Sequence, residues 1–250
     1  MFGVSKDEFL MRVRDALGKT EVSADPEYVP LKIRRQHQRQ KVVTVKARAD
    51  ARRTEILDSL IRVAGLNGWH VYRSDSVESV VDYVVSLAKK KRIRRIVRSD
   101  DKFLKTIPLD EKLQKNGANV KVVRRGRNLS RKQLRRDMAQ AQLGITGVDY
   151  AVAETGTCVL LSRDGMSRAV SLLPTVHVAI VEARQVYENL DDLFAVCRLA
   201  FQDNRYDMGS YMSFISGPSR TADIEQTIVV GVHGPKEAHM VLLDSSGIKS

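Results

Sequence analysis

The stretch that decides the fold is Ser76–Val97, SVESVVDYVVSLAKKKRIRRIV. Serine is a preferred residue at a helix N-cap, so Ser76 predicts the start of a helix that runs to Lys89. Ile93–Val97 follows as a short run rich in β-branched residues, which is typical of a strand. A helix followed directly by a strand is the repeating unit of α/β sheets.

The same alternation extends on both sides of this stretch. Helices are predicted for Ala47–Ala64, Asp110–Lys115, Arg131–Gln142 and Leu190–Phe201. Strands are predicted for His70–Tyr72, Val120–Val123, Val176–Val181, Tyr211–Ile215 and Met240–Leu243, with a hairpin of Tyr150–Ala153 and Thr157–Leu161 around the turn Glu154–Gly156. The sequence therefore predicts an α/β fold with a mostly parallel open sheet flanked by helices, a pattern that also fits a Rossmann-type sheet.

The N-terminal region has a different pattern. Lys6–Leu17 carries apolar residues at helical spacing and is followed by Gly18, which predicts an amphipathic helix. Thr20–Lys41 contains two prolines and no clean period, and we interpret it as an extended basic arm. We predict a division into residues 1–46 and an α/β domain of residues 47–250. The helix either docks onto a partner or a second copy of the chain, or folds back onto its own domain.

Charge is distributed unevenly along the 250 residues. The net charge is +12, yet residues 143–250 hold 8 Lys and Arg against 13 Asp and Glu, which leaves 34 basic and 17 acidic residues in positions 1–142. A basic half indicates a solvated surface, an acidic partner, an anionic ligand or nucleic acid. Nucleic acid is the least favoured, because no basic cluster contains a recognisable stacking aromatic or a reading motif.

The sequence shows neither a segment for secretion or membrane insertion nor a set of cluster-binding cysteines. There is no secretory signal, and Ala169–Val181, the longest uncharged apolar stretch, is broken by Pro174 and too short for a bilayer, so we predict a cytoplasmic protein with no membrane span. Cys158 and Cys197 are the only cysteines, and each lies in an apolar run. An iron–sulfur cluster normally takes four thiolates, so we expect no cluster in this chain.

Polar groups of several kinds gather near the C-terminus. Gly217-Pro218-Ser219-Arg220-Thr221-Ala222-Asp223-Ile224-Glu225 leads through an apolar run into Gly231-Val232-His233-Gly234-Pro235. Asp223 and Gln226 have the spacing of an N-cap and an N3 residue, so a short helix is predicted to begin there. Free helix amides beside Arg220 would suit a carboxylate or phosphate. Alternatively, Arg220 pairs with Asp223 or Glu225 and only pins the loop.

This pair of segments resembles the signature of the LUD-domain family, and specifically its lactate-utilisation protein C (LutC) group. Two further segments share the resemblance: Glu154-Thr155-Gly156-Thr157 after the apolar strand, and Leu173-Pro174-Thr175-Val176-His177. The resemblance is clear over residues 143–244. It implies a fold of the NagB/RpiA/CoA-transferase-like class, in which ligands bind at the carboxyl ends of strands. Both motif loops follow predicted strands, so we expect them to face one crevice.

Candidate site residues follow from these motifs. Glu154 resembles the placement of a catalytic glutamate in CoA-transferases of this fold class, or else it is a turn carboxylate that accepts backbone amides. His233 lies between two glycines and is either a general acid or base or a hydrogen-bonded spacer. The predicted catalytic residues are Glu154 and His233. The predicted ligand-binding residues are Thr155, Gly156, Thr157, Gly217, Ser219, Arg220, Thr221, Asp223 and Glu225. We predict no metal site, because the histidines show no HExxH-like spacing.

The resemblance implies a role in the oxidation of L-lactate to pyruvate, as an accessory or substrate-side subunit. It further implies separate iron–sulfur proteins as partners and a small anion such as lactate as ligand, with homo-oligomerisation through the N-terminal helix as an open alternative. One rival is a stand-alone enzyme of the CoA-transferase or sugar-phosphate isomerase type. A third interpretation is a nucleic-acid-binding regulator.

Overall fold

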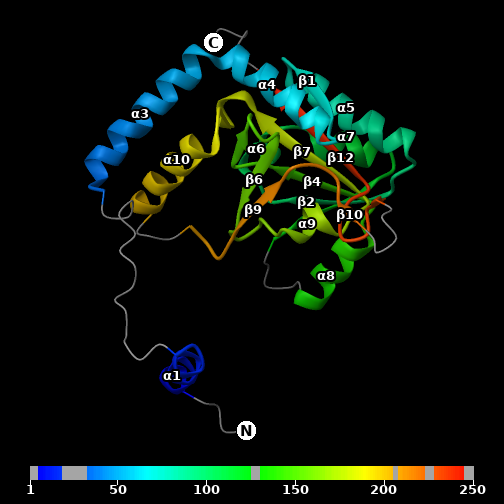
Figure 1. The fold of residues 1–250 in the computed structure, drawn as a ribbon. Helices are drawn as coiled ribbons and strands as arrows, with labels where there is room; N and C mark the ends of the chain where they lie inside the picture. Colours follow the sequence, from blue (N-terminus) through cyan, green and yellow to red (C-terminus); the bar gives the residue numbers. More distant parts are fainter. Residues whose placement is uncertain (1–4, 19–32, 125–129, 205–207, 223–227, 245–250) are drawn as a thin grey trace. The chain divides into compact units, whose positions relative to one another are not determined.

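The computed structural model describes residues 5–18, 33–124, 130–204, 208–222 and 228–244 (Figure 1). Contacts divide the chain into two units, Met1–Arg34 and Arg35–Ser250, whereas the sequence predicts a division after residue 46. In the first unit, helix α1 (Lys6–Ala16) begins at Ser5, whose Oγ accepts a hydrogen bond from the amide of Glu8. The predicted N-terminal helix is therefore confirmed.

The second unit begins with two helices, α3 (Arg35–Ala51) and α4 (Arg53–Leu66). The predicted extended arm is therefore wrong for Arg35–Lys41, while residues 20–32 lie outside the described part. Packing against helix α10 (Leu190–Asp203) explains the difference, because Val42 and Val45 are buried there and Gln38 Nε2 donates to the carbonyl of Ala195. The predicted single helix over Ala47–Ala64 is also two helices, since the chain leaves helical geometry at Arg52.

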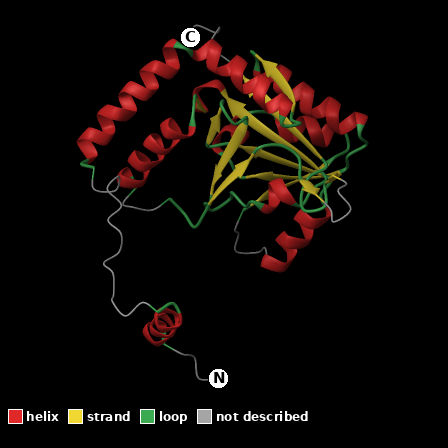
Figure 2. Ribbon diagram, viewed as in Figure 1, coloured by secondary structure: helices red, strands yellow, loops and turns green. Residues whose placement is uncertain are grey.

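The central feature is a six-stranded sheet in which every neighbouring pair is parallel. Its order is β1-β12-β7-β4-β2-β3. The strands are β1 (His70–Ser74), β2 (Arg95–Ser99), β3 (Asn119–Val123), β4 (Leu143–Gly147), β7 (Val176–Glu182) and β12 (Glu237–Leu243). β4, β7 and β12 are almost entirely buried, as expected for a parallel sheet covered on both faces. The predicted α/β class with a parallel sheet and flanking helices is confirmed (Figure 2).

The two faces of this sheet are covered differently. One face packs on α5 (Val77–Lys90), α6 (Lys102–Thr106) and α7 (Leu109–Lys115), with Leu104, Leu109 and Ile145 among the core residues. The other face packs partly on α4 and a second sheet, and partly on α8 (Arg131–Gln140) and α9 (Ala169–Leu172). Within the described residues, no helix combines the length and apolarity needed to cross a membrane.

The second sheet has the order β8-β5-β6-β9. Its strands are β5 (Tyr150–Val152), β6 (Thr157–Leu161), β8 (Val186–Tyr187) and β9 (Met212–Ile215), and a single 3-10 turn, Ala183–Gln185, precedes β8. β5 and β6 form the predicted hairpin. Two short strands, β10 (Arg220–Ala222) and β11 (Ile228–Val230), form a separate antiparallel pair.

The strand order of the parallel sheet reverses between β2 and β4. From β2 the chain continues to β3 at one edge, whereas from β4 it continues through β7 and β12 toward the other edge. In open α/β sheets, the carboxyl ends at such a reversal form the crevice in which ligands commonly bind. The loops that follow Ser99 and Gly147 are therefore the place that the fold itself favours for a ligand.

Candidate functional site

The three motif loops meet around the end of α4. We call this group the motif-loop cluster: residues 154–157, 216–220 and 231–235 together with Asn67 and Gly68. Asn67 Nδ2 donates to the carbonyl of Thr155 at 2.8 Å, and Arg220 Nη2 donates to the carbonyl of Asn67 at 3.1 Å. The hydroxyls of Thr157 and Ser216 lie 2.8 Å apart. The end of α4 therefore joins the first motif loop to the second.

Backbone hydrogen bonds join the second motif loop to the third. The amide of Ser219 donates to the carbonyl of Pro235 at 3.0 Å, and the amide of Gly231 donates to the carbonyl of Ser219 at 2.9 Å. Gly217 has φ 139° and a Cβ there would lie 2.5 Å from the carbonyl oxygen of Asn67, so this close approach requires glycine. Segments far apart in the sequence are thus held together as one polar surface.

The location of this cluster differs from the expectation. Residues 154–157 and 216–220 follow β5 and β9 of the second sheet, not strands of the parallel sheet. In the parallel sheet, the segments 67–69 and 231–236 lead into β1 and β12, so the cluster lies at the amino ends of these strands. The expectation that the motif loops lie at carboxyl ends is therefore wrong for the parallel sheet.

The structure places Glu154 and its neighbours in different environments. Glu154 is exposed, and its Oε1 accepts a hydrogen bond from the amide of Leu190 at 2.9 Å, in the first turn of α10. Gly156 is buried with φ 59°, packed against the backbone of α4. Thr157 donates its hydroxyl to the carbonyl of Thr155, while the Thr155 hydroxyl is buried without a hydrogen-bond partner in the described structure. The catalytic role of Glu154 stays a prediction.

The remaining predicted residues that the structure describes are exposed or partly buried. His233 and Arg220 are exposed, and Ser219 is partly buried against Gly234. Thr221 belongs to β10 and pairs with Val229. Asp223 and Glu225, with the helix start predicted there, lie outside the described residues. The ligand-binding and catalytic roles of these side chains stay predictions.

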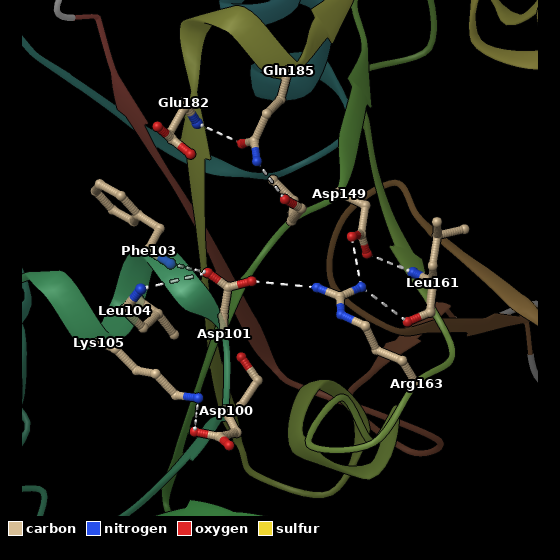
Figure 3. A network of polar contacts seen from close by, with 12 residues as sticks. Asp100, Asp101, Phe103, Leu104, Lys105, Asp149, Leu161, Arg163, Glu182 and Gln185 are labelled. Atoms are coloured by element: carbon tan, nitrogen blue, oxygen red, sulfur yellow. Dashed lines mark hydrogen bonds and ion pairs between the residues drawn. The ribbon is translucent and has the colours of Figure 1, made fainter. Parts of the chain in front are cut away.

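A second polar group lies at the carboxyl ends of β2 and β4, where the strand order reverses (Figure 3). We call it the carboxyl-end network: Asp100, Asp101, Lys105, Asp149 and Arg163. Arg163 Nη1 contacts Asp149 Oδ1 at 2.6 Å, and Arg163 Nη2 contacts Asp101 Oδ2 at 3.3 Å. Arg163 thereby links the loop after β2 to the loop after β4.

Two carboxylates of the network, those of Asp101 and Asp149, also bind backbone amides. Asp101 Oδ1 accepts from the amide of Phe103 at 2.9 Å and caps α6, and Asp149 Oδ2 accepts from the amide of Leu161 at 2.7 Å. Lys105 Nζ lies 3.0 Å from Asp100 Oδ1. Such contacts hold the loops in fixed positions, as a ligand site requires.

A cavity of about 530 Å³ adjoins Arg163. Its walls come from the end of β3, from α8, and from the loops after β6 and before β9. Cationic and hydroxyl groups are prominent among its lining residues, which include Arg124, Arg135, Arg163, Ser167, Ser210 and Tyr211. A volume of this size suits a small or cofactor-sized ligand, and its arginines suit an anionic group.

Sequence reasoning missed the carboxyl-end network. Asp149 and Arg163 flank the β5–β6 hairpin, but Asp101 is remote from both in the sequence, and the order of the strands brings it to them. The one signal available was Arg163-Asp164-Gly165, a polar turn directly after an apolar strand.

Both cysteines are buried, in agreement with their positions in apolar runs of the sequence. Burial raises the pKa of the Cys197 thiol to about 12, and burial also raises the pKa of Cys158. Both side chains are therefore protonated near neutral pH, and neither is a reactive thiolate there.

Comparisons with known proteins complete the description of the site. A model of the LUD domain matches residues 57–243. A protein of Halalkalibacterium halodurans called "Lactate utilization protein C" is 29% identical over 248 residues, which cover 96% of this chain and 97% of that protein. The protein of the same name from Bacillus subtilis is 40% identical over 104 residues, 42% of this chain and 43% of that protein.

Among solved structures, the chain resembles the crystal structure of a DUF162 family protein from Deinococcus radiodurans. The TM-score is 0.52 at 20% sequence identity, over 76% of this chain and 98% of that chain. At this identity the likeness concerns the fold alone.

Proposed function

Because this chain belongs to the LUD-domain family, we propose that it acts in the oxidation of L-lactate to pyruvate, as an accessory or substrate-side subunit beside separate iron–sulfur proteins. Similarity to lactate utilization protein C over 96% of the chain supports the link to lactate. The proposal that this chain holds a binding site is supported by one structural observation: three motif loops, distant in sequence, meet at the end of α4.

The number and burial of the cysteines support the proposal that partner subunits, and not this chain, hold the iron–sulfur clusters. Oxidation of lactate releases two electrons, and iron–sulfur clusters that carry electrons normally need four cysteine thiolates. This chain has two cysteines, and burial raises the pKa of both. In the proposal, partner subunits therefore hold the clusters, and the basic first half of this chain suits an acidic partner surface.

The motif-loop cluster is the proposed binding site for the small anion. A guanidinium binds a carboxylate through two parallel hydrogen bonds, and Arg220 is the exposed arginine of the cluster. The buried Thr155 hydroxyl is available to a ligand or a water molecule. Glu154 and His233 are the proposed acid–base groups, because the hydroxyl of a 2-hydroxy acid must lose a proton when it becomes a carbonyl.

The test is purification of a tagged copy at native level and low salt from cells grown on lactate, with cells grown on another carbon source as the control. We expect cysteine-rich iron–sulfur proteins to co-purify, together with lactate-oxidising activity. This activity should fall when the chain is stripped away and return when it is added back. A solitary chain in lactate-grown cells would contradict the accessory-subunit proposal.

A second candidate function is favoured by the cavity of about 530 Å³ beside Arg163, which we call the carboxyl-end cavity. A sugar-phosphate or CoA ligand carries phosphate groups, and Arg124, Arg135 and Arg163 line this cavity, which adjoins the carboxyl-end network. A stand-alone isomerase or CoA-transferase predicts turnover by the purified chain. In the transferase case Glu154→Gln abolishes that turnover. Absence of turnover with both ligand classes would rule against this alternative.

A further inference from the structure

A cluster of two histidines and a glutamate shares no residue with either site described above. His70, Glu237 and His239 each place one potential ligand atom within 4.8 Å of those of the other two. They lie at the amino ends of β1 and β12, beside α5, and border a cavity of about 490 Å³. We call these three residues the His–Glu cluster.

The strand register brings the three residues together. β1 and β12 are parallel neighbours, and His70 is paired with His239. Glu237 and His239 are two residues apart on one strand, so their side chains point to the same face. The two imidazole rings are stacked, with centroids 4.8 Å apart. The sheet itself thus sets the positions of all three potential ligands.

His239 is held in a way that leaves one nitrogen available. The residue is only 5% exposed, and its Nδ1 lies 2.9 Å from the hydroxyl of Tyr83 on α5. Its Nε2 is buried, has no hydrogen-bond partner in the described structure and lies 3.5 Å from Glu237 Oε2. A hydrogen bond to one ring nitrogen that fixes the other toward the ion is the usual support for a metal-binding histidine.

Glu237 supplies negative charge for a cation, and the adjoining cavity supplies space. Lys91 Nζ lies 2.6 Å from Glu237 Oε1, so a lysine ammonium now occupies the position beside this carboxylate that a metal ion would take. The adjoining cavity, whose lining includes Ser86, has room for water molecules that would complete a coordination shell.

We propose that His70, Glu237 and His239 bind a divalent transition-metal ion of the zinc class, with water in the remaining position. Two imidazoles and one carboxylate form a donor set typical of zinc, whereas magnesium and calcium prefer oxygen alone. Zinc–ligand bonds of about 2.0–2.2 Å put neighbouring donors roughly 3.3 Å apart, so His70 and Glu237 must turn inward. Both have the freedom to do so, since His70 is exposed and Glu237 partly exposed. The ion would take the place of the Lys91 ammonium at Glu237.

This site differs from the prediction that the chain has no metal-ligating residues. His70 is remote in sequence from Glu237 and His239, so the spacing gave no signal. The inference does not depend on the proposed role in lactate oxidation, because no residue of the His–Glu cluster belongs to the motif-loop cluster.

The test is titration of the chelator-treated full chain with Zn²⁺ by calorimetry, and with Co²⁺ by visible absorption. We expect one ion per chain, and at least a tenfold weaker affinity for His70→Ala and Glu237→Gln. Lys91→Met should bind more tightly than the wild type, because it removes the competing ammonium. His37→Ala, which removes an exposed histidine of α3, should leave the affinity unchanged.

Three results of the calorimetric titrations would overturn the inference. They are the absence of stoichiometric binding, binding that His70→Ala and Glu237→Gln leave intact, and binding that His37→Ala weakens equally. His70 is exposed, so His70→Ala should fold, and circular dichroism of each variant checks this. A sixfold-coordinate cobalt spectrum without imidazole features would likewise contradict ligation by the two histidines.

Discussion

The motif-loop cluster and the carboxyl-end network lie at opposite ends of the same β5–β6 hairpin. The turn of this hairpin, residues 154–157, belongs to the cluster, while Asp149 and Arg163 flank its open end. The motifs that carry the family resemblance gather at the first end, whereas the strand reversal and the cavity of about 530 Å³ lie at the second. Motif position and the general rule of α/β folds therefore indicate different places for the ligand.

The largest difference between the two ends should appear when a methyl group is added to a glycine. Gly156 and Gly165 both have positive φ, 59° and 78°. A Cβ at Gly156 would lie 2.6 Å from the backbone nitrogen of Ala64, in the last turn of α4, whereas at Gly165 it would meet the Asp100 side chain. Gly156→Ala should lower the free energy of unfolding by about 3 kcal/mol, and Gly165→Ala by about 1–2 kcal/mol.

Urea denaturation at 25 °C measures both losses. The larger effect at Gly156 would establish that contact with α4 fixes the motif turn, because displacing helix backbone costs more free energy than displacing a side chain. Equal losses would contradict this and mean that packing constrains the two loops to the same extent.

Acid should destabilise the fold through a buried histidine at the amino end of β7. His177 on β7 packs near Trp69, and its Nε2 lies 2.9 Å from the Thr146 hydroxyl. Burial lowers the pKa of His177 to about 3, so the unfolded chain, with a pKa near 6.5, binds the proton first. Stability is therefore complete above about pH 6.5 and falls as the pH drops toward 3, by roughly 3 kcal/mol at pH 4.5.

Unfolding free energies of His177→Leu at pH 7.5 and pH 4.5 test this origin. The variant should lose about 3 kcal/mol of the acid dependence. Thr146→Val is the matched control, because it removes the same hydrogen bond and keeps the titrating group. If the pH dependence of stability were unchanged in His177→Leu, other groups, such as His239, would have to be its cause.

The choice between the two ends for the anion depends on one arginine at each. Arg220 belongs to the motif-loop cluster and Arg163 to the carboxyl-end network, and both are exposed. A hydrogen bond to a charged group contributes about 1.5–3 kcal/mol, so removal of the arginine that binds substrate should lower kcat/KM by at least about tenfold. We expect this loss for Arg220→Gln and less than about a twofold change for Arg163→Gln.

Lactate oxidation by the purified assembly measures both variants, with Arg184→Gln as the neutral control. Arg184 is exposed and pairs only locally, with Glu182, among the contacts resolved for it. The reverse order of effects would indicate that the ligand binds in the carboxyl-end cavity. The general rule that ligands of α/β sheets bind at the carboxyl ends of strands would then predict the site better than the position of the motifs does.

Local patterns predicted the secondary structure well where tertiary contacts agree with them. The helix after Ser76 and the hairpin around Gly156 have capping and turn residues that act within a few positions, so the sequence alone determines them. Arg35–Lys41 has no apolar period and becomes helical through contacts with α10, such as Gln38 to Ala195. Such long-range stabilisation leaves no mark in the local sequence.

The candidate sites show the same limit. The motif loops were found because their residues are contiguous, but their position at the amino ends of β1 and β12 depends on the sheet order. The position of β12 between β1 and β7 also creates the His–Glu cluster. No periodicity in the sequence specifies which strands become neighbours, so residues united by strand order alone could not be predicted.

The smallest expected effect concerns the outer part of the carboxyl-end network. Lys105 is half-exposed and pairs with Asp100 at 3.0 Å, and such surface pairs contribute about 0–1 kcal/mol. Lys105→Gln should change the free energy of unfolding by less than about 0.5 kcal/mol, and the difference should vanish in about 1 M salt. Urea denaturation at low and high salt checks this. A loss above about 1.5 kcal/mol would mean that these charges serve the fold, because groups so strongly engaged with one another have little to offer a ligand.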